Sequence, residues 1–330
     1  MIVRILAILS VAFVLSQFYR SVMAVIAPEI GREVRLNSGQ LGVLSAAFFV
    51  AFGLMQIPVG VLLDRFGQRR TIAITLLVTT GGTLWFALGQ DFVGLTAARA
   101  LMGVGCAAVF MGVLVTCSRW LPPARFGSAS SVSIGIGGLG VLLATTPFVA
   151  LQTLVGWRGA FLIIAVVTGA TALATWLGVR DAPPGHPSHD RPSESLRDVL
   201  RGVRQVLGNR QLPYVLAVAF TGYSSVMAVV GMWGGPYLDA VFGLTGVARG
   251  NVLFAIAAAV VSGSFLFGFL DQVVRTRTRL MLASGSIVAA VFVTLAAVPG
   301  LSAWQVTGLL MLLALANGYV VLNYAQARLL

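Results

Sequence analysis

The sequence predicts an all-α polytopic membrane protein with about ten transmembrane helices, on the basis of its composition and its long apolar runs. Of its 330 residues, 58% are hydrophobic and only 10% are charged, whereas a soluble domain carries roughly a quarter charged residues. Apolar runs of about 20 residues are what a helix needs to cross the hydrocarbon core of a bilayer. The chain is therefore expected to form a helical bundle within a membrane.

Ten such runs follow one another along the chain, and nearly all of the connections between them are short. They are centred on 5–28, 39–62, 71–90, 93–117, 127–151, 159–179, 212–235, 249–270, 279–298 and 303–326. A longer polar stretch separates the first six runs from the last four. The sequence therefore predicts an N-terminal six-helix half at 1–180, a cytoplasmic linker at 181–211 and an incomplete C-terminal half of four helices at 212–330.

Part of the linker has the pattern of an amphipathic helix. Apolar residues recur at helical spacing from Leu196 to Leu207, and Ser195 with Asp198 fits a capping box at the start. Because arginines occupy its other faces, such a helix would lie on the anionic inner leaflet. A solvated tether is the alternative.

The distribution of arginine predicts the topology. Arginine supplies all 22 basic residues. With the N-terminus placed inside, sixteen fall in inner segments, two within spans, and four in outer loops, namely Arg32, Arg35, Arg158 and Arg249. This bias follows the positive-inside rule and predicts a bacterial-type inner (plasma) membrane protein with a cytoplasmic N-terminus. Arginines confined to short loops indicate topology and contact with the lipid bilayer, not a surface for nucleic acid.

The most specific motif is a basic loop between the second and third runs, Gly60-Val61-Leu62-Leu63-Asp64-Arg65-Phe66-Gly67-Gln68-Arg69-Arg70. Gly60 would let two helices approach closely, and Gly67 would supply a turn that a side chain hinders. The motif resembles the signature loop between helices two and three of the major facilitator superfamily. A partial second copy follows the eighth run, with Asp271 placed 207 residues after the first aspartate (271 minus 64) and followed by Arg275, Arg277 and Arg279. An ordinary membrane turn with cytoplasmic arginines is the alternative.

The resemblance implies two six-helix halves that rock about a site at the middle of the membrane, as in a secondary transporter that works by alternating access. It implies a role in conformational gating for Gly60, Asp64, Arg65, Gly67, Arg69, Arg70, Asp271 and Arg99. A complete member has twelve spans, whereas this chain ends just after the tenth. A truncated, non-transporting remnant or partner protein is therefore one alternative function, and a drug/proton efflux antiporter is another.

Charged side chains within the runs point to the substrate class. An ionised side chain in the middle of a bilayer costs roughly 2.5–3.5 kcal/mol, yet Arg20 and Arg99 fall within spans and no aspartate or glutamate lies in a span core. A guanidinium is well suited to carboxylate, nitrate or phosphate oxygens. The sequence therefore predicts a small organic or inorganic anion as substrate. Two alternatives stay open: Arg20 could snorkel to the outer interface, and Glu29 could reach an outer arginine.

Arg20 is the residue predicted to contact the anion, with Gln17, Gln56 and Tyr223 predicted to line the same cavity. A proton or substrate gradient is the expected driving force. The sequence contains no phosphate-cradling loop, no nucleophile elbow and no metal-ligand spacing. We therefore expect a transporter of a small-molecule substrate and not an enzyme, with no cofactor and no metal site.

Overall fold

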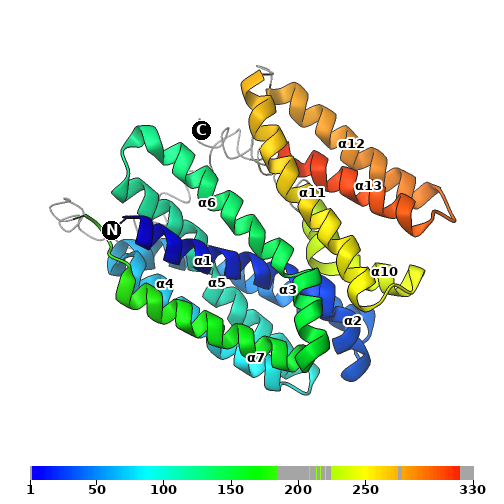
Figure 1. Ribbon diagram of the computed structural model, residues 1–330, viewed down its shortest axis with the longest axis horizontal. Helices are drawn as coiled ribbons and strands as arrows, with labels where there is room; N and C mark the ends of the chain where they lie inside the picture. Colours follow the sequence, from blue (N-terminus) through cyan, green and yellow to red (C-terminus); the bar gives the residue numbers. More distant parts are fainter. Residues whose placement is uncertain are drawn as a thin grey trace.

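The computed structural model describes residues 2–183, 224–273 and 277–319, together with a few single positions between 208 and 220. Within these residues the chain is helical, with short turns and no strand (Figure 1). Its elements are α1 (Ile2–Ser21), α2 (Met23–Glu33), α3 (Ser38–Leu54), α4 (Gln56–Leu88), α5 (Phe92–Trp120), α6 (Pro123–Leu143), α7 (Thr146–Gly178), the π-helix η2 (Met227–Trp233), α10 (Gly234–Phe242), α11 (Gly246–Val273), α12 (Arg277–Ala297), α13 (Ala303–Ala316) and the short 3₁₀ turn η3 (Asn317–Tyr319). The all-α prediction is confirmed.

The helices form two groups. In Figure 1, α1 to α7 make up one bundle, and α10 to α13 lie beside it as a second, smaller group. In the larger bundle α4 packs along α5 and α7, and α1 packs along α6; in the smaller group α11 packs along α13. The two groups meet where α10 contacts α2 and where α11 contacts α6 and α7. Because α1 and α2 also contact η2, both helices lie at the boundary between the groups.

Six helical segments of the described part are long and apolar enough to cross a membrane, fewer than the ten runs of the sequence. One reason is that α4 and α7, each of 33 residues, continue through a sharp bend and so join parts of neighbouring runs. The bends lie at Gly67 (φ 78°) and Gly156 (φ 73°). Glycine adopts this left-handed region without the steric penalty of a side chain, so the predicted turn at Gly67 is confirmed.

Several helix boundaries differ from the apolar runs. The first run is split at Val22 into α1 and α2, and helix then continues to Glu33, beyond the expected end at residue 28. The fifth run was expected to reach residue 151, but α6 ends at Leu143 and a new helix begins at Thr146. Apolar composition continues on both sides of each boundary. Hydropathy therefore predicts which residues lie in the membrane, but it does not predict where one helix ends and the next begins. The predicted linker helix lies outside the described residues.

Aromatic packing fixes α1 against the rest of the larger bundle. Phe18 on α1 meets the ring of Phe148 with centroids 5.3 Å apart, and Phe148 in turn meets Phe161 at 5.6 Å. Phe86 of α4 lies 4.9 Å from Phe161. Aromatic pairs with this spacing contribute roughly 0.5–1.5 kcal/mol beyond their buried area. The cluster therefore holds α1, α4 and α7 in a fixed relation.

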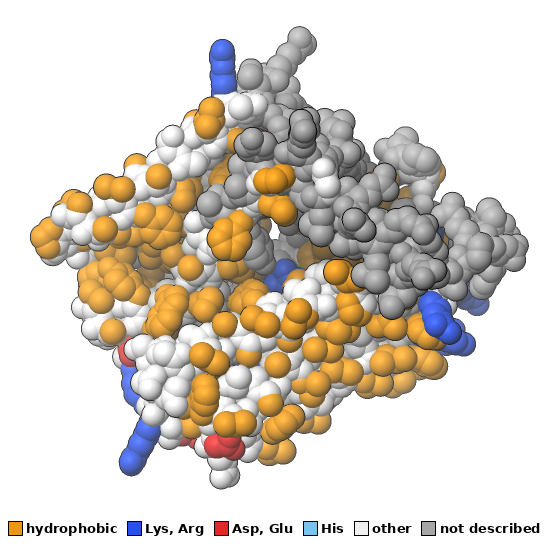
Figure 2. Space-filling view, turned by 180° about the vertical axis from the view of Figure 1, so that it is seen from behind, with side chains coloured by type: hydrophobic (Ala, Val, Ile, Leu, Met, Phe, Trp, Pro, Cys, Tyr) orange, Lys and Arg blue, Asp and Glu red, His pale blue; other side chains and the backbone are white. Residues whose placement is uncertain are grey.

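The outer surface is largely apolar, as a lipid-facing surface must be. Leu77, Val166 and Leu173 are all more than half exposed, and Figure 2 shows hydrophobic side chains spread over the helices, with charged side chains mainly at the ends. The same view shows the molecule hollowed between the two groups of helices, with a basic side chain visible inside the hollow. Since the chain contains no lysine, that side chain is an arginine.

Candidate functional site

Two arginines from different helices meet at one stack of phenyl rings. The guanidinium of Arg20, at the end of α1, lies 4.2 Å from the ring centroid of Phe52. The guanidinium of Arg99, on α5, lies 4.7 Å from the centroid of Phe48. Phe48 and Phe52 are one turn apart on α3 and stack at 6.2 Å with an interplanar angle of 12°. The structure therefore places each of the two intramembrane arginines against one ring of the same aromatic pair.

Arg99 is fully buried. Its NH1 atom donates to the carbonyl oxygen of Tyr19 at 3.0 Å, whereas its Nε and NH2 atoms are buried with no hydrogen-bond acceptor among the described residues. Burying a charge without full pairing is costly, and a desolvated phenyl face offsets roughly 2 kcal/mol of that cost. Among the described residues, no carboxylate therefore balances the positive charge of Arg99.

A chain of hydroxyl groups fixes the backbone that supports both arginines. The Tyr19 hydroxyl lies 2.8 Å from Oγ1 of Thr168 on α7 and 2.9 Å from Oγ1 of Thr83 on α4. Tyr19 is completely buried, so these contacts satisfy a polar group that would otherwise be unpaired. Because Tyr19 precedes Arg20 and its carbonyl accepts from Arg99, the hydroxyl chain sets the position of both cations.

The other three predicted cavity residues differ in their hydrogen bonding and in whether the structure describes them. Gln17 lies one turn before Arg20 on α1, and its Oε1 atom is buried with no donor among the described residues. Gln56 is half-buried, and its Nε2 atom donates to the carbonyl of Phe52 on the adjoining helix at 3.4 Å. Tyr223 lies outside the described residues. Gln17 is therefore the predicted polar residue whose side chain offers a free acceptor near the arginine pair.

A second charged cluster joins the two groups of helices at the end predicted to face outward. Arg249, near the start of α11, is fully buried and forms an ion pair with Glu29 of α2. It also donates to the carbonyl of Val25 at 2.9 Å and lies 3.5 Å from a carboxylate oxygen of Asp239 on α10. Asp239 pairs in turn with Arg32 of α2. The four charges form a network across the boundary between the two groups of helices.

This cluster corrects one sequence-based expectation and confirms another. The positive-inside count placed Arg249 in an outer loop, but its side chain has no exposed surface because α2 and α10 close over it. The alternative that Glu29 reaches an outer arginine is correct, and its partner is Arg249.

A close backbone contact between the two groups of helices lies beside this network. A Cβ atom at Gly235 of α10 would be only 1.6 Å from the carbonyl oxygen of Ala24 on α2. Real Cβ atoms do not come this close to another heavy atom, so only glycine fits while α2 and α10 remain in contact. The Ala24–Gly235 contact and the charge network together close the predicted outer end in this structure.

At the other end, the loop motif is held by a residue that the sequence analysis did not select. The carboxylate of Asp181, just after α7, accepts from the backbone N–H of Arg69 at 2.8 Å, and its carbonyl accepts from Nε2 of Gln68 at 2.6 Å. A Cβ at Gly67 would lie 2.5 Å from that carboxylate. Asp181 therefore acts as the N-cap of the arm that follows Gly67, from a distant part of the chain.

The remaining motif residues are placed as follows. Arg69 donates from Nε to the carbonyl of Trp176 at 2.6 Å. Asp64, Arg65 and Arg70 are exposed, and none of the three forms an ion pair with a described residue. Asp271 lies in the last turn of α11. Arg69 thus holds the motif against α7, whereas Asp64, Arg65 and Arg70 form an exposed charged surface.

The expected close approach of helices at Gly60 is not observed. A Cβ there would meet no atom within 4 Å, because no described helix packs on that position of α4. Tight packing at Gly60 therefore stays a prediction, without a contact among the described residues.

Sequence reasoning missed Asp181, placed Arg249 in a loop, and named Glu29 without its partner. Asp181 was assigned to the start of the linker because it precedes a proline-rich stretch. The only sequence signal for Arg249 and Glu29 was their charge near the ends of apolar runs, which does not say which two would meet. Their pairing became visible only when α2 and α11 were placed together.

Comparison with known proteins identifies the family. A family model described as the Major Facilitator Superfamily matches residues 9–328. The chain belongs to the major facilitator superfamily. The prediction made from the Gly60–Arg70 loop is confirmed, and the protein is a multi-pass membrane protein of this superfamily.

Curated relatives are similar over part of their length. The probable sulfoacetate transporter SauU of Cupriavidus necator is 25% identical over 182 residues, which are 55% of this chain and 42% of that protein. The nitrate/nitrite transporter NrtP of Nostoc punctiforme is 31% identical over 48% of this chain and 33% of that protein. The probable galactarate/D-glucarate transporter GarP of Escherichia coli is 24% identical over 80% of this chain and 65% of that protein. The chain spans between about a third and two thirds of the length of these relatives.

Solved structures share the fold. The crystal structure of a bacterial homologue of the human lysosomal transporter Spinster, in an inward-facing and unoccupied conformation, matches with a TM-score of 0.73 at 21% identity. The match covers 97% of this chain and 74% of that chain. The arrangement of helices in Figure 1 is therefore that of a known transporter fold.

Proposed function

We propose that the protein is a secondary transporter that moves a small organic or inorganic anion across a bacterial inner membrane by alternating access. The observation that carries the proposal is the fully buried Arg99, which shares an aromatic pair with Arg20 and has no carboxylate partner among the described residues. An anion bound between the two guanidinium groups would supply the missing negative charge. Bidentate contacts from arginine suit planar carboxylate, nitrate and sulfonate-like oxygens.

The relatives support the same substrate class. Those named above are described as transporters of sulfoacetate, of nitrate and nitrite, and of galactarate and glucarate. All of these solutes are small anions, although they differ in size and in the geometry of their charged group. The comparison therefore supports an anion as the class of substrate, but it does not select one anion among them.

The geometry also supports alternating access. The predicted outer end is closed by the Ala24–Gly235 contact and the Arg249 network, while a hollow lies between the halves (Figure 2). Opening that end requires α10 and α11 to leave α2, which breaks the ion pairs of Arg249. We propose that Asp64, Arg65, Arg69 and Arg70 stabilise the complementary state at the cytoplasmic end, and that a proton or substrate gradient drives the cycle.

Uptake into proteoliposomes tests the anion proposal. Protein with Arg20→Gln is expected to bind nitrate and small dicarboxylates at least tenfold more weakly, because one of two guanidinium contacts is lost. Arg4→Gln is the matched control, since Arg4 lies on the same helix and is exposed, and it should leave uptake unchanged.

Three outcomes would contradict the proposal. Unchanged anion affinity in Arg20→Gln would show that Arg20 does not contact the solute. Efflux of cationic dyes without anion transport would favour an exporter. A stably inserted protein that moves no solute would favour a partner protein without transport activity.

A further inference from the structure

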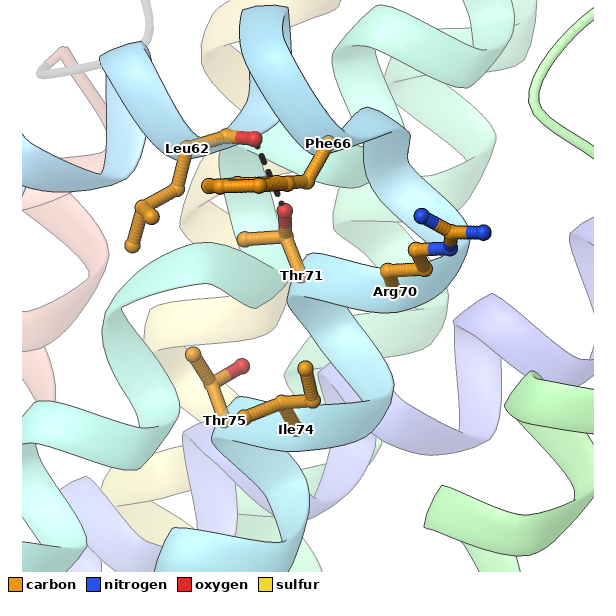
Figure 3. Close-up of a pocket in the computed structure, with 6 residues that line it drawn as sticks. All are labelled: Leu62, Phe66, Arg70, Thr71, Ile74 and Thr75. Atoms are coloured by element: carbon orange, nitrogen blue, oxygen red, sulfur yellow. Dashed lines mark hydrogen bonds between the residues drawn. The ribbon is translucent and has the colours of Figure 1, made fainter.

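A small cavity lies in the bend of α4, on a different part of the molecule from the arginine pair. Its volume is about 180 Å³, and it is lined by Leu62, Phe66, Arg70, Thr71, Ile74 and Thr75 (Figure 3). The first two residues precede the turn at Gly67 and the others follow it. The cavity, called here the α4 groove, is therefore formed by the two arms of one bent helix.

The floor of the α4 groove offers no free polar group. The hydroxyl of Thr71 donates to the carbonyl of Leu62 at 3.0 Å, which is the bond drawn in Figure 3. The hydroxyl of Thr75 donates to the carbonyl of Ile72 at 3.1 Å. Both threonines are buried, and their hydrogen-bonding capacity is used within the helix. The groove therefore presents apolar surface to its occupant.

The apolar walls of the groove face away from Asp64, the acidic residue of the loop motif. Phe66 and Ile74 are 46% and 54% exposed, an exposure that large apolar side chains have when they face lipid chains. On a helix, positions two apart point in nearly opposite directions, so Leu62 and Phe66 lie on the face opposite to Asp64. The α4 groove thus opens towards the bilayer.

Arg70 supplies one positive charge at the rim. Its side chain is exposed, and Figure 3 shows its guanidinium turned away from Leu62 while its stem lies beside Thr71. No hydrogen bond or ion pair joins it to a described residue, whereas Arg69 is held by the carbonyl of Trp176. The exposed Arg65 lies 5.5 Å from the ring of Phe66 and adds a second charge nearby.

We propose that the α4 groove binds one anionic phospholipid, with its phosphate on Arg70 and one acyl chain between Phe66 and Ile74. The four residues from Arg70 to Ile74 rise about 6 Å along the helix, so the cation lies one turn nearer the bend at Gly67 than Ile74 does. This matches a lipid whose phosphate lies above its first methylene groups. The inference goes beyond the transported solute and does not depend on it.

Charge, and not chain burial, decides which lipid binds. An acyl chain that enters the groove comes from the hydrocarbon core of the bilayer and not from water. The hydrophobic effect therefore contributes little to its binding. A single arginine near an anionic membrane surface favours binding by about fivefold. We therefore expect selectivity for an anionic over a zwitterionic headgroup of about that size, and little dependence on chain length.

Native mass spectrometry of the detergent-purified protein tests the proposal. Titration with dioleoylphosphatidylglycerol is expected to give one tightly retained lipid, bound about fivefold better than dioleoylphosphatidylcholine. Arg70→Gln should abolish this preference, Arg70→Lys should retain it, and Phe66→Ala should weaken retention of both lipids by opening one wall. Arg279→Gln is the matched control, because Arg279 is also exposed but lies on α12.

The alternatives are separated by the same experiment. Glycerol 1-phosphate, which has the charged group without the chains, should compete poorly; binding as tight as that of the lipid would mean a phosphate site and would overturn the proposal. An equal loss of preference in Arg279→Gln would show that general surface charge, and not the groove, selects the lipid. Thermal unfolding of each variant in detergent confirms that the comparisons are made on folded protein.

Discussion

Replacing Arg249 by glutamine is expected to weaken the closure of the predicted outer end by about 2 kcal/mol. Removing one partner of a fully buried ion pair typically costs about 3–5 kcal/mol. Arg249 has no exposed side-chain surface, but Glu29 and Asp239 retain 21% and 19%, so water can compensate part of the loss. Because every 1.4 kcal/mol is a factor of ten, the ratio of open to closed forms should rise about 30-fold.

Labelling of a buried cysteine measures this change. Ser21 is 2% exposed and lies where α1 meets α2, behind the network. In Ser21→Cys protein, a membrane-impermeant maleimide added from outside should react slowly, and the additional Arg249→Gln substitution should accelerate the reaction about 30-fold. The parent protein, whose two cysteines Cys106 and Cys117 are buried, gives the background.

Arg32→Gln is the matched control for the same experiment. Arg32 pairs with Asp239 across the same boundary, but 59% of its side chain is exposed, and exposed ion pairs contribute roughly 0.2–1 kcal/mol. Its removal should change the labelling rate by no more than about fivefold. Equal effects of the two substitutions, or no acceleration in Arg249→Gln, would refute the argument that burial makes Arg249 the main closing contact.

Three further predictions concern packing and caps. Gly235→Ala should favour the open outer end as Arg249→Gln does, since its Cβ would collide with the carbonyl of Ala24; unchanged labelling of Ser21→Cys would contradict the close contact. Asp181→Ala should lower the free energy of unfolding in detergent by about 1 kcal/mol through loss of a helix cap, while substitution of the exposed Asp64 should have a smaller effect. Tyr19→Phe should lower the free energy of unfolding by about 1 kcal/mol and weaken anion uptake, because its hydroxyl contacts position the backbone beside both arginines; normal uptake would show that the hydroxyl chain is not needed at the site.

Local features of the fold were predictable from the sequence because they depend on neighbouring residues. The turn at Gly67 follows from a glycine between two apolar runs, and the φ of 78° shows why a glycine is needed. The break after Leu143 was not predicted, because the residues on both sides are apolar and a membrane helix can end without a change in composition.

For the candidate site, the sequence identified the two charged side chains but not their relation. Arg20 and Arg99 stood out because a charge within an apolar run is costly. Nothing in the sequence indicated that both would lie on the ring pair of Phe48 and Phe52, since α1, α3 and α5 meet only in the folded bundle. Gln56 was chosen as a cavity residue from polarity alone, and the structure shows its amide bonded to the carbonyl of Phe52 on the preceding helix.

The sequence by itself determined that this chain is a helical membrane protein of the major facilitator superfamily, because hydropathy and the loop motif are local properties of the chain. Only the tertiary structure decided which charges meet. Arg249 and Glu29 are 220 residues apart in sequence, and Asp181 accepts from the N–H of Arg69, which lies 112 residues earlier. Such pairs depend on how whole helices pack, and packing is set by the sum of many contacts that no single stretch of sequence contains.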